Sequence, residues 1–234
     1  MKGYDMKVLI FCAHADDEVI GMGGTIRKFA SAGAEIRLVI FSEGAEGYAS
    51  PEEKSRIVEK RDKEVRNVCT LLGIGEYFNL HGLDWNLKVN NETYRQVIHH
   101  IRQFRPDVIF THARRDYNDH QSVSKAVEEG WFHASLECAM EQDPPFPMVP
   151  LYEFEVLTMM DQPEFIADIT EELEYKLKAM ECYGSQTGVV GSAGQMITGR
   201  AMLRGQQIGV KYGEAFHRSS YRPATVTDIR QFLS

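Results

Sequence analysis

Short apolar runs alternate with segments of helical length along the first half of this chain. The runs suit buried strands, and the segments between them repeat apolar side chains at the spacing of a helix that packs on a sheet. The predicted strands are residues 7–13, 35–41, 76–80 and 107–111, and the predicted helices are residues 21–32, 51–72 and 92–104. Because this alternation is typical of βαβ crossovers, we expect a three-layer, doubly wound α/β fold with a mostly parallel, Rossmann-like sheet.

Turn-forming residues mark the ends of the first two helices. Gly33 and Gly73 follow them, and glycine readily adopts the positive φ that closes a last helical turn. Ser50 precedes the second helix as the expected N-cap, with Pro51 at the first helical position and Glu53 three residues after the cap. These signals predict a single long helix from Pro51 to about Leu72.

The second half adds a few more expected elements. They are helices over residues 120–139 and 170–183 and strands over residues 151–159 and 165–169. Residues 184–205 contain six glycines, so we expect that segment to be partly irregular. No compositional break divides the 234 residues, and 43% hydrophobic content can bury one substantial core. Residues 1–234 are therefore expected to form a single domain.

Composition argues against several classes of function. The net charge of −8 disfavours a nucleic-acid or anionic-membrane surface. The four cysteines are scattered, which favours a reducing compartment. No apolar run approaches the roughly 20 residues that span a bilayer, and residues 1–7 are too short and polar for a signal peptide. We expect a cytoplasmic protein with a small-molecule substrate, no nucleic-acid partner and no membrane insertion.

Imidazoles and carboxylates follow three of the predicted strands. His14, Asp16 and Asp17 come directly after the first strand, Glu43 after the second, and the segment 112–120 after the fourth. In a parallel sheet, ligands bind beyond the carboxyl ends of the strands, so we expect these loops to converge at one edge. The carboxylates there are costly to bury without a nearby positive charge.

A metal ion is a natural partner for this cluster. His14 and Asp17 are three residues apart, which places their side chains on the same side of a first helical turn. His120 is the best-placed third ligand, because catalytic zinc sites use three protein ligands and leave a position for water. Two imidazoles and one carboxylate suit Zn²⁺, and Fe²⁺, Co²⁺ or Mn²⁺ would tolerate the same set.

Two further carboxylates have expected roles beside these ligands. Asp16 can face a metal-activated water as general base and later return a proton to a leaving amine. Asp119 directly precedes His120, and its expected task is to orient a neighbouring ring or a catalytic group. The pattern therefore indicates a metal-activated water with a general base beside it.

These residues as a set resemble the PIG-L/LmbE-like family of zinc-dependent N-acetylglucosaminide deacetylases. The family's opening signature, A-H-P-D-D-E, is matched by residues 13–18, which read A-H-A-D-D-E, and its second motif, H-P-D-H, is matched by residues 117–120, which read Y-N-D-H. Further elements occur in the family's order: R-x-x-E at 61–64, D-I-T at 168–170, K-x-x-A at 176–179, S-Q at 185–186 and Y-x-E-x-F at 212–216.

The resemblance implies a set of roles and an activity. It implies metal ligands at His14, Asp17 and His120, Asp16 as general base, and Arg61 in contact with the substrate or the departing acetate. The implied reaction removes an acetyl group from an N-acetylated amino sugar or its conjugate, with Zn²⁺ as cofactor, and a homo-oligomer is reasonable. Glu43 and His112 complete the candidate substrate-binding residues.

The chain departs from the family pattern at two positions. Ala15 replaces the proline of the opening signature, which relaxes a turn and leaves every ligand atom in place. Tyr117 stands where the family has a histidine that stabilises the oxyanion, and a phenol can donate a hydrogen bond but carries no positive charge. If this loop is one residue shorter, His112 or an arginine from Arg114–Arg115 supplies the donor instead.

Other readings stay open beside this one. A catalytically impaired metal- or sugar-binding module of the same fold is the main alternative, because of Tyr117. Arg61 also fits a solvated helix face, since it lies in a run of charges over residues 59–64. The glycines between Gly21 and Gly24, after the first strand, suggest a dinucleotide-binding site. The motif G-x-G-x-x-G is absent, however, and carboxylates stand where a pyrophosphate would lie.

Overall fold

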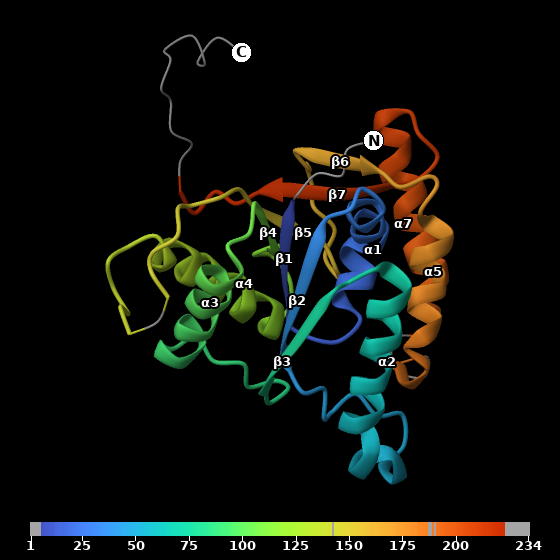
Figure 1. The fold of residues 1–234 in the computed structure, drawn as a ribbon. Helices are drawn as coiled ribbons and strands as arrows, with labels where there is room; N and C mark the ends of the chain where they lie inside the picture. Colours follow the sequence, from blue (N-terminus) through green and yellow to red (C-terminus); the bar gives the residue numbers. More distant parts are fainter. Residues whose placement is uncertain (1–5, 142, 187–188, 190, 223–234) are drawn as a thin grey trace.

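The computed structural model describes residues 6–141, 143–186, 189 and 191–222, which form a seven-stranded mixed sheet with helices on both faces (Figure 1). The strands are β1 (Lys7–Cys12), β2 (Glu35–Ser42), β3 (Glu76–Gly82), β4 (Val108–His112), β5 (Leu151–Phe154), β6 (Phe165–Asp168) and β7 (Gly213–Arg218). The helices are α1 (Asp17–Ser31), α2 (Ile57–Leu72), α3 (Asn91–Phe104), α4 (Asn118–Ala134), α5 (Leu173–Cys182) and α7 (Ala193–Ile208), with short 3₁₀ helices η1 (Pro51–Arg56) and η2 (Gly184–Gln186). The segment 1–7, examined above for a leader, falls largely outside these residues.

The strand order confirms the predicted doubly wound α/β class. It runs β3-β2-β1-β4-β5-β7-β6, and the first five strands are parallel to their neighbours. β7 is antiparallel to both β5 and β6, so the sheet is mixed at one edge. The chain winds outward from β1 in one direction and from β4 in the other, which makes the gap between these two strands a topological switch point.

The two faces of the sheet bury separate apolar clusters. Val8, Ile10 and Cys12 of β1 point to the side covered by α1, α2, α5 and α7 (Figure 1). Leu9 and Phe11 alternate with them and pack under α3 and α4. This period of two, with apolar side chains on both sides, is why the first strand was recognisable as fully buried. Among the described residues, no helix is both long and apolar enough to cross a membrane.

The predicted helices differ from the observed ones at their ends, and α2 and α4 differ most. The segment after Pro51 begins as a 3₁₀ helix and becomes α-helical only at Ile57, and the Ser50 side chain makes no capping hydrogen bond. α4 ends at Ala134 instead of residue 139. The buried guanidinium of Arg102 explains this early end, because it donates to the carbonyl oxygens of His133, Ala134, Leu136, Cys138 and Ala139. The chain wraps around that cation instead of continuing the helix.

Residues 184–205 were expected to be partly irregular, and the second part of this segment is helical. Ala193–Ile208 is the continuous helix α7, even though it contains several glycines. Tertiary packing overrides the low helix propensity of glycine here. Ile197 and Ala201 are buried against the sheet, and Arg204 forms a buried ion pair with Glu155 at 2.6 Å.

The glycines of α1 have a packing role in this structure. A side chain at Gly21 would collide with the ring of Phe154, which lies where its Cβ would be. Further along, the backbone N–H groups of Gly24 and Thr25 donate to the carboxylate of Glu214, which also pairs with the buried Lys176 at 2.6 Å. Gly21 lets α1 approach β5. The glycines of α1 therefore have a packing role and are no longer a reason to expect a dinucleotide site.

Candidate metal and active site

The candidate site lies at the switch point, beyond the carboxyl ends of β1 and β4. A cavity of about 530 Å³ opens there. Its lining residues are His14, Asp16, Asp17, Ile20, Gly44, Glu46, Gly47, Arg61, Asp84, Trp85, Tyr117, His120, Val156, Leu157, Gln186, Val189 and Met196. The loops after β1, β2, β3 and β4 therefore converge at one edge of the sheet, as a doubly wound topology requires.

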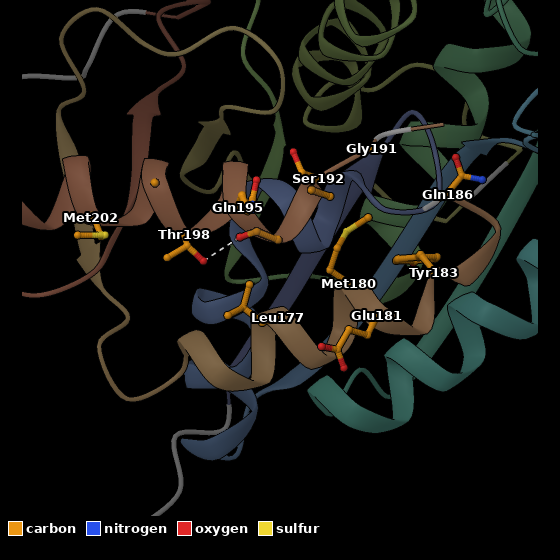
Figure 2. Close-up of a pocket in the computed structure, with 13 residues that line it drawn as sticks. Leu177, Met180, Glu181, Tyr183, Gln186, Gly191, Ser192, Gln195, Thr198 and Met202 are labelled. Atoms are coloured by element: carbon orange, nitrogen blue, oxygen red, sulfur yellow. Dashed lines mark hydrogen bonds between the residues drawn. The ribbon is translucent and has the colours of Figure 1, made fainter. Parts of the chain in front are cut away.

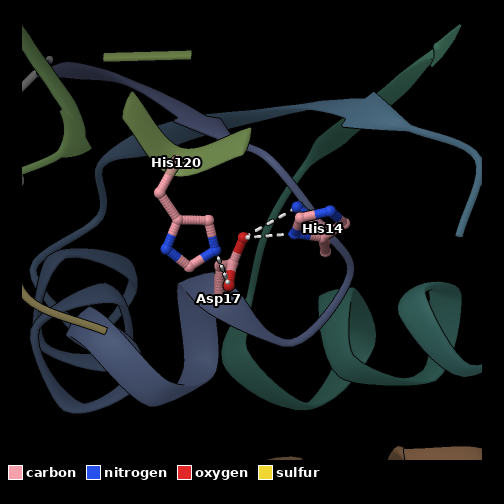
Figure 3. A group of neighbouring side chains, drawn as sticks. All are labelled: His14, Asp17 and His120. Carbon is pink, nitrogen blue, oxygen red and sulfur yellow. Dashed lines mark hydrogen bonds and ion pairs between the residues drawn. The ribbon is translucent and has the colours of Figure 1, made fainter. Parts of the chain in front are cut away.

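His14, Asp17 and His120 come together at the base of this cavity (Figure 3). The Asp17 carboxylate lies between the two rings, with Oδ1 3.1 Å from His120 Nε2 and Oδ2 3.6 Å from His14 Nδ1. One ligand atom from each residue lies within 4.8 Å of the others. Two imidazole nitrogens and one carboxylate oxygen at this separation fit a divalent transition metal with a position left for water.

A carboxylate stands behind each of the two imidazoles. Asp119 Oδ2 is 3.2 Å from His14 Nε2, and Asp116 Oδ2 is 3.3 Å from His120 Nδ1. Each ring therefore turns one nitrogen toward a supporting carboxylate and the other toward Asp17. Such pairs fix the tautomer and orientation of histidine ligands. Asp119 lies where the sequence places it, whereas Asp116 was missed, although its position four residues before His120, in the same segment after β4, was a usable signal.

Replacing Asp116 with asparagine is expected to weaken metal binding about 10- to 100-fold, because the amide supports the His120 ring less strongly than a carboxylate. Competition against a chromophoric chelator measures this affinity. Asp161→Asn makes the same chemical change at a side chain that is 81% exposed and serves as the control. An unchanged affinity in Asp116→Asn would show that this carboxylate does not support the ligand.

The cluster holds protons when no ion is bound. Burial disfavours a charge on His14, yet hydrogen bonds with Asp119 and Asp17 outweigh it and raise its pKa to about 10. Burial lowers the pKa of His120, but Asp17 and Asp116 outweigh this effect and raise it to about 9. At neutral pH these imidazolium charges offset the buried carboxylates, and a metal ion has to displace their protons to bind.

Asp16 faces the same cavity without being one of the three ligands. It is the N-cap residue of α1 and has φ of 116°, a conformation that few residues other than glycine adopt. Burial raises the pKa of its carboxyl group to about 7, with the charge of Arg61 opposing the rise. A carboxyl group poised near neutrality suits both taking and returning a proton.

Arg61 is a buried residue of α2 and not part of a solvated face. Its side chain is 4% exposed, while the flanking Lys60 and Lys63 are exposed. Nη2 donates to the carbonyl oxygen of Ala15 at 2.6 Å. The loop after β2 closes over it at Gly44, where φ is +72° and a Cβ would collide with the Arg61 side chain. The guanidinium is thereby held beside the turn that carries Asp16.

Glu43 and His112 were expected at the substrate, but neither lines the cavity. Glu43 is half-buried and its backbone N–H donates to the carbonyl of Gly82, so Glu46 is the acidic residue of that loop that reaches the cavity. His112 is fully buried below Asp17, and its Nε2 accepts the N–H of Ala13. Burial and the charge of His120 lower the pKa of His112 to about 4, so it stays neutral.

Tyr117 lines the cavity, while the alternative donors point elsewhere. The Tyr117 hydroxyl is 2.9 Å from His14 Nδ1, and its ring is stacked on that of His14. Burial, with Asp17 and Asp119, raises the pKa of the phenol, so it stays protonated and can donate. Arg114 pairs with Glu128 and Arg115 pairs with Asp161, and neither lines the cavity.

A larger cavity, of about 780 Å³, lies between α5 and the start of α7 (Figure 2). Its described lining is apolar or uncharged apart from Glu181. It offers no cluster of titratable groups among these residues. The chemistry of the side chains, and not the size of the cavity, therefore selects the switch point as the candidate active site.

Known proteins are similar to this chain in sequence and in fold. A model of the family described as PIG-L, GlcNAc-PI de-N-acetylase, matches residues 9–131. The 1D-myo-inositol 2-acetamido-2-deoxy-alpha-D-glucopyranoside deacetylase of Thermomonospora curvata is 30% identical over 147 residues, which are 51% of this chain and 49% of that protein. The chain thus spans about half the length of this curated relative.

Two solved structures are similar to this chain in fold. The N,N'-diacetylchitobiose deacetylase of Pyrococcus horikoshii superposes with a TM-score of 0.85 at 26% identity, over 97% of this chain and 88% of that one. A 4-carboxy-2-hydroxymuconate hydratase of Pseudomonas putida has a TM-score of 0.78 at 21% identity, over 96% and 99%, which shows only that the fold is shared. The family match, by contrast, spans residues 14, 17 and 120, and the chain belongs to the PIG-L (GlcNAc-PI de-N-acetylase) family.

Proposed function

We propose that this chain is a metal-dependent hydrolase that removes an acetyl group from an N-acetylated amino sugar or its conjugate. The observation that carries the proposal is the placement of Asp16 and Tyr117 in the same cavity as His14, Asp17 and His120. A ligand set, a proton acceptor and a hydrogen-bond donor around one space are the parts that amide hydrolysis needs.

Zinc is the proposed ion, held by His14, Asp17 and His120, because the donor set of two nitrogens and one oxygen is typical of catalytic zinc. When bound, the ion would polarise the acetamide carbonyl and lower the pKa of a water molecule toward about 7. Asp116 and Asp119 contact the two imidazoles and would hold them in place for the ion.

Asp16 moves the protons in this proposal. Its carboxylate takes a proton from the attacking water and returns it to the amine nitrogen as the carbon–nitrogen bond breaks. The pKa of about 7 places it near the point where it can do both at neutral pH. Arg61, held against the Ala15 carbonyl, keeps a positive charge beside this carboxyl group and near the departing acetate.

Tyr117 donates to the oxygen that gains negative charge in the transition state. Replacing it with phenylalanine is expected to lower kcat about 100-fold, since one preorganised donor is removed while the ring still packs against His14 and His120. Steady-state acetate release measures the change. A kcat within about 2-fold of the unsubstituted protein would mean that the hydroxyl does not serve the oxyanion.

The names of the relatives support the substrate class. Enzymes similar to this chain act on a 2-acetamido-2-deoxyglucopyranoside and on diacetylchitobiose, both of which carry an acetamido group on a sugar. We also propose a reducing, cytoplasmic compartment, for which the four free cysteines are the support.

Acetate release from a panel of N-acetylglucosaminides tests the proposal. The zinc-loaded protein should release acetate and free amine in equal amounts from at least one of N-acetylglucosamine, diacetylchitobiose and N-acetylglucosaminyl-inositol. Binding of the sugars without release of either product would favour the alternative, a metal- or sugar-binding module that has lost catalysis.

A further inference from the structure

Trp85 is an exposed aromatic side chain at the mouth of the candidate active site. It is 71% exposed, yet it lines the same cavity as His14 and His120. A large aromatic surface left open to water beside reactive groups is a feature of binding sites, because its burial is deferred until a ligand arrives.

The backbone at Trp85 is held in an unusual conformation. Its φ is 62°, in the left-handed region that bulky residues rarely occupy. The Trp85 N–H donates to Asp119 Oδ2 at 2.7 Å, and the neighbouring Asp84 accepts the Glu46 N–H at 2.6 Å. Strain of this kind persists where the surrounding structure enforces it, and it concentrates at functional sites. Since Asp119 also contacts His14, the position of Trp85 is tied to that of a metal-ligand candidate.

The rest of the cavity offers groups that complement a sugar. Glu46, Arg61, Asp84 and Gln186 line the same cavity as Trp85. A pyranose ring presents apolar C–H groups on its faces and hydroxyl groups at its edge. An aromatic face next to carboxylate, amide and guanidinium groups can therefore cover one side of such a ring and hydrogen-bond its rim.

We propose that Trp85 stacks on the pyranose ring that carries the acetamido group and so selects sugars over other acetamides. This inference rests on the proposed function and adds a specificity-determining residue to it. The indole buries one face of the ring, and the Trp85 backbone is held by Asp119, which also contacts His14 of the ligand cluster.

Kinetics of substituted proteins give the first test. Trp85→Ala is expected to raise KM for N-acetylglucosamine at least 10-fold while kcat stays within about 2-fold, and Trp85→Phe is expected to recover most of the loss. Leu83→Ala is the matched control, because Leu83 belongs to the same loop and is 57% exposed but does not line the cavity. An unchanged KM in Trp85→Ala would overturn the proposal, as would an equal rise in Leu83→Ala.

Fluorescence gives a test that does not need turnover. The chain has two tryptophans, and Trp131 is only 7% exposed, so acrylamide quenching reports mainly Trp85. N-acetylglucosamine should protect the emission of the zinc-loaded protein from acrylamide, and Trp85→Ala should lose that protection. Protection without acetate release would retain the stacking role and reject only the proposed hydrolysis. Acetate release without protection would overturn the stacking role. An unchanged KM in Trp85→Ala would also overturn it, even if the substitution changed the oligomeric state.

Discussion

Replacing Asp16 with asparagine is expected to lower kcat for acetate release at least about 100-fold while the protein keeps its metal. The carboxylate is the proposed acceptor of the proton from water, and loss of a general base typically costs 10²- to 10⁴-fold in rate. Asparagine suits the test better than alanine, because it tolerates positive φ and Asp16 has φ of 116°. The turn between β1 and α1 is therefore expected to survive the substitution.

The measurement combines acetate release with elemental analysis of the same sample. Asp161→Asn, at an exposed side chain outside the cavity, makes the matched control and should retain full activity. If Asp16→Asn keeps both its metal and its rate, Asp16 does not act as the base. If it loses the metal, Asp16 belongs among the ligands instead.

The second large effect is expected at Asp17, whose replacement with asparagine should abolish both metal binding and activity. Its carboxylate lies between His14 and His120 and is the one anionic member of the proposed ligand set. Loss of a carboxylate behind a ligand weakens binding about 10- to 100-fold, so loss of the ligand itself is expected to exceed 100-fold.

Folding has to be separated from binding in that experiment. Asp17 also accepts the backbone N–H of His14 at 2.7 Å, an acceptor role that the asparagine oxygen can keep. After chelation, Asp17→Asn should still unfold in one cooperative transition, at a lower midpoint because His14 and His120 lose an ion-pair partner. Added zinc should raise the midpoint of the unsubstituted protein alone. A zinc-dependent rise of equal size in Asp17→Asn would contradict the assignment of this ligand.

The fold was predictable where buried side chains give a regular spacing of apolar residues in the sequence. β1 and β2 are apolar on both faces, and Gly73 closes α2 with φ of 84°, so both strands and that helix end follow local rules. The end of α4 was not predictable from local rules, because Arg102 lies on α3 and its buried guanidinium binds the carbonyl oxygens of Ala134 and Leu136. α7 was obscured by its glycines, since its stability comes from packing against the sheet.

The candidate site was predictable to the extent that its residues adjoin strand ends. His14, Asp16, Asp17 and His120 sit directly after β1 or at the start of α4, and a parallel sheet brings such positions together. Trp85 could not be found this way, since it lies in a loop whose path is set by hydrogen bonds to Asp119 and around Asp84. Nor does the sequence distinguish the buried His112 from one that faces a substrate.

Titration of the metal-free protein with zinc tests the central claim most directly. Acetate release from the best N-acetylglucosaminide is recorded after each addition and plotted against zinc per chain. The rate is predicted to rise linearly and to level off at one equivalent, because His14, Asp17 and His120 are the proposed ligands of a single ion. Acetate release that is independent of zinc and of the other transition metals, or no acetate release at any loading, would contradict the account.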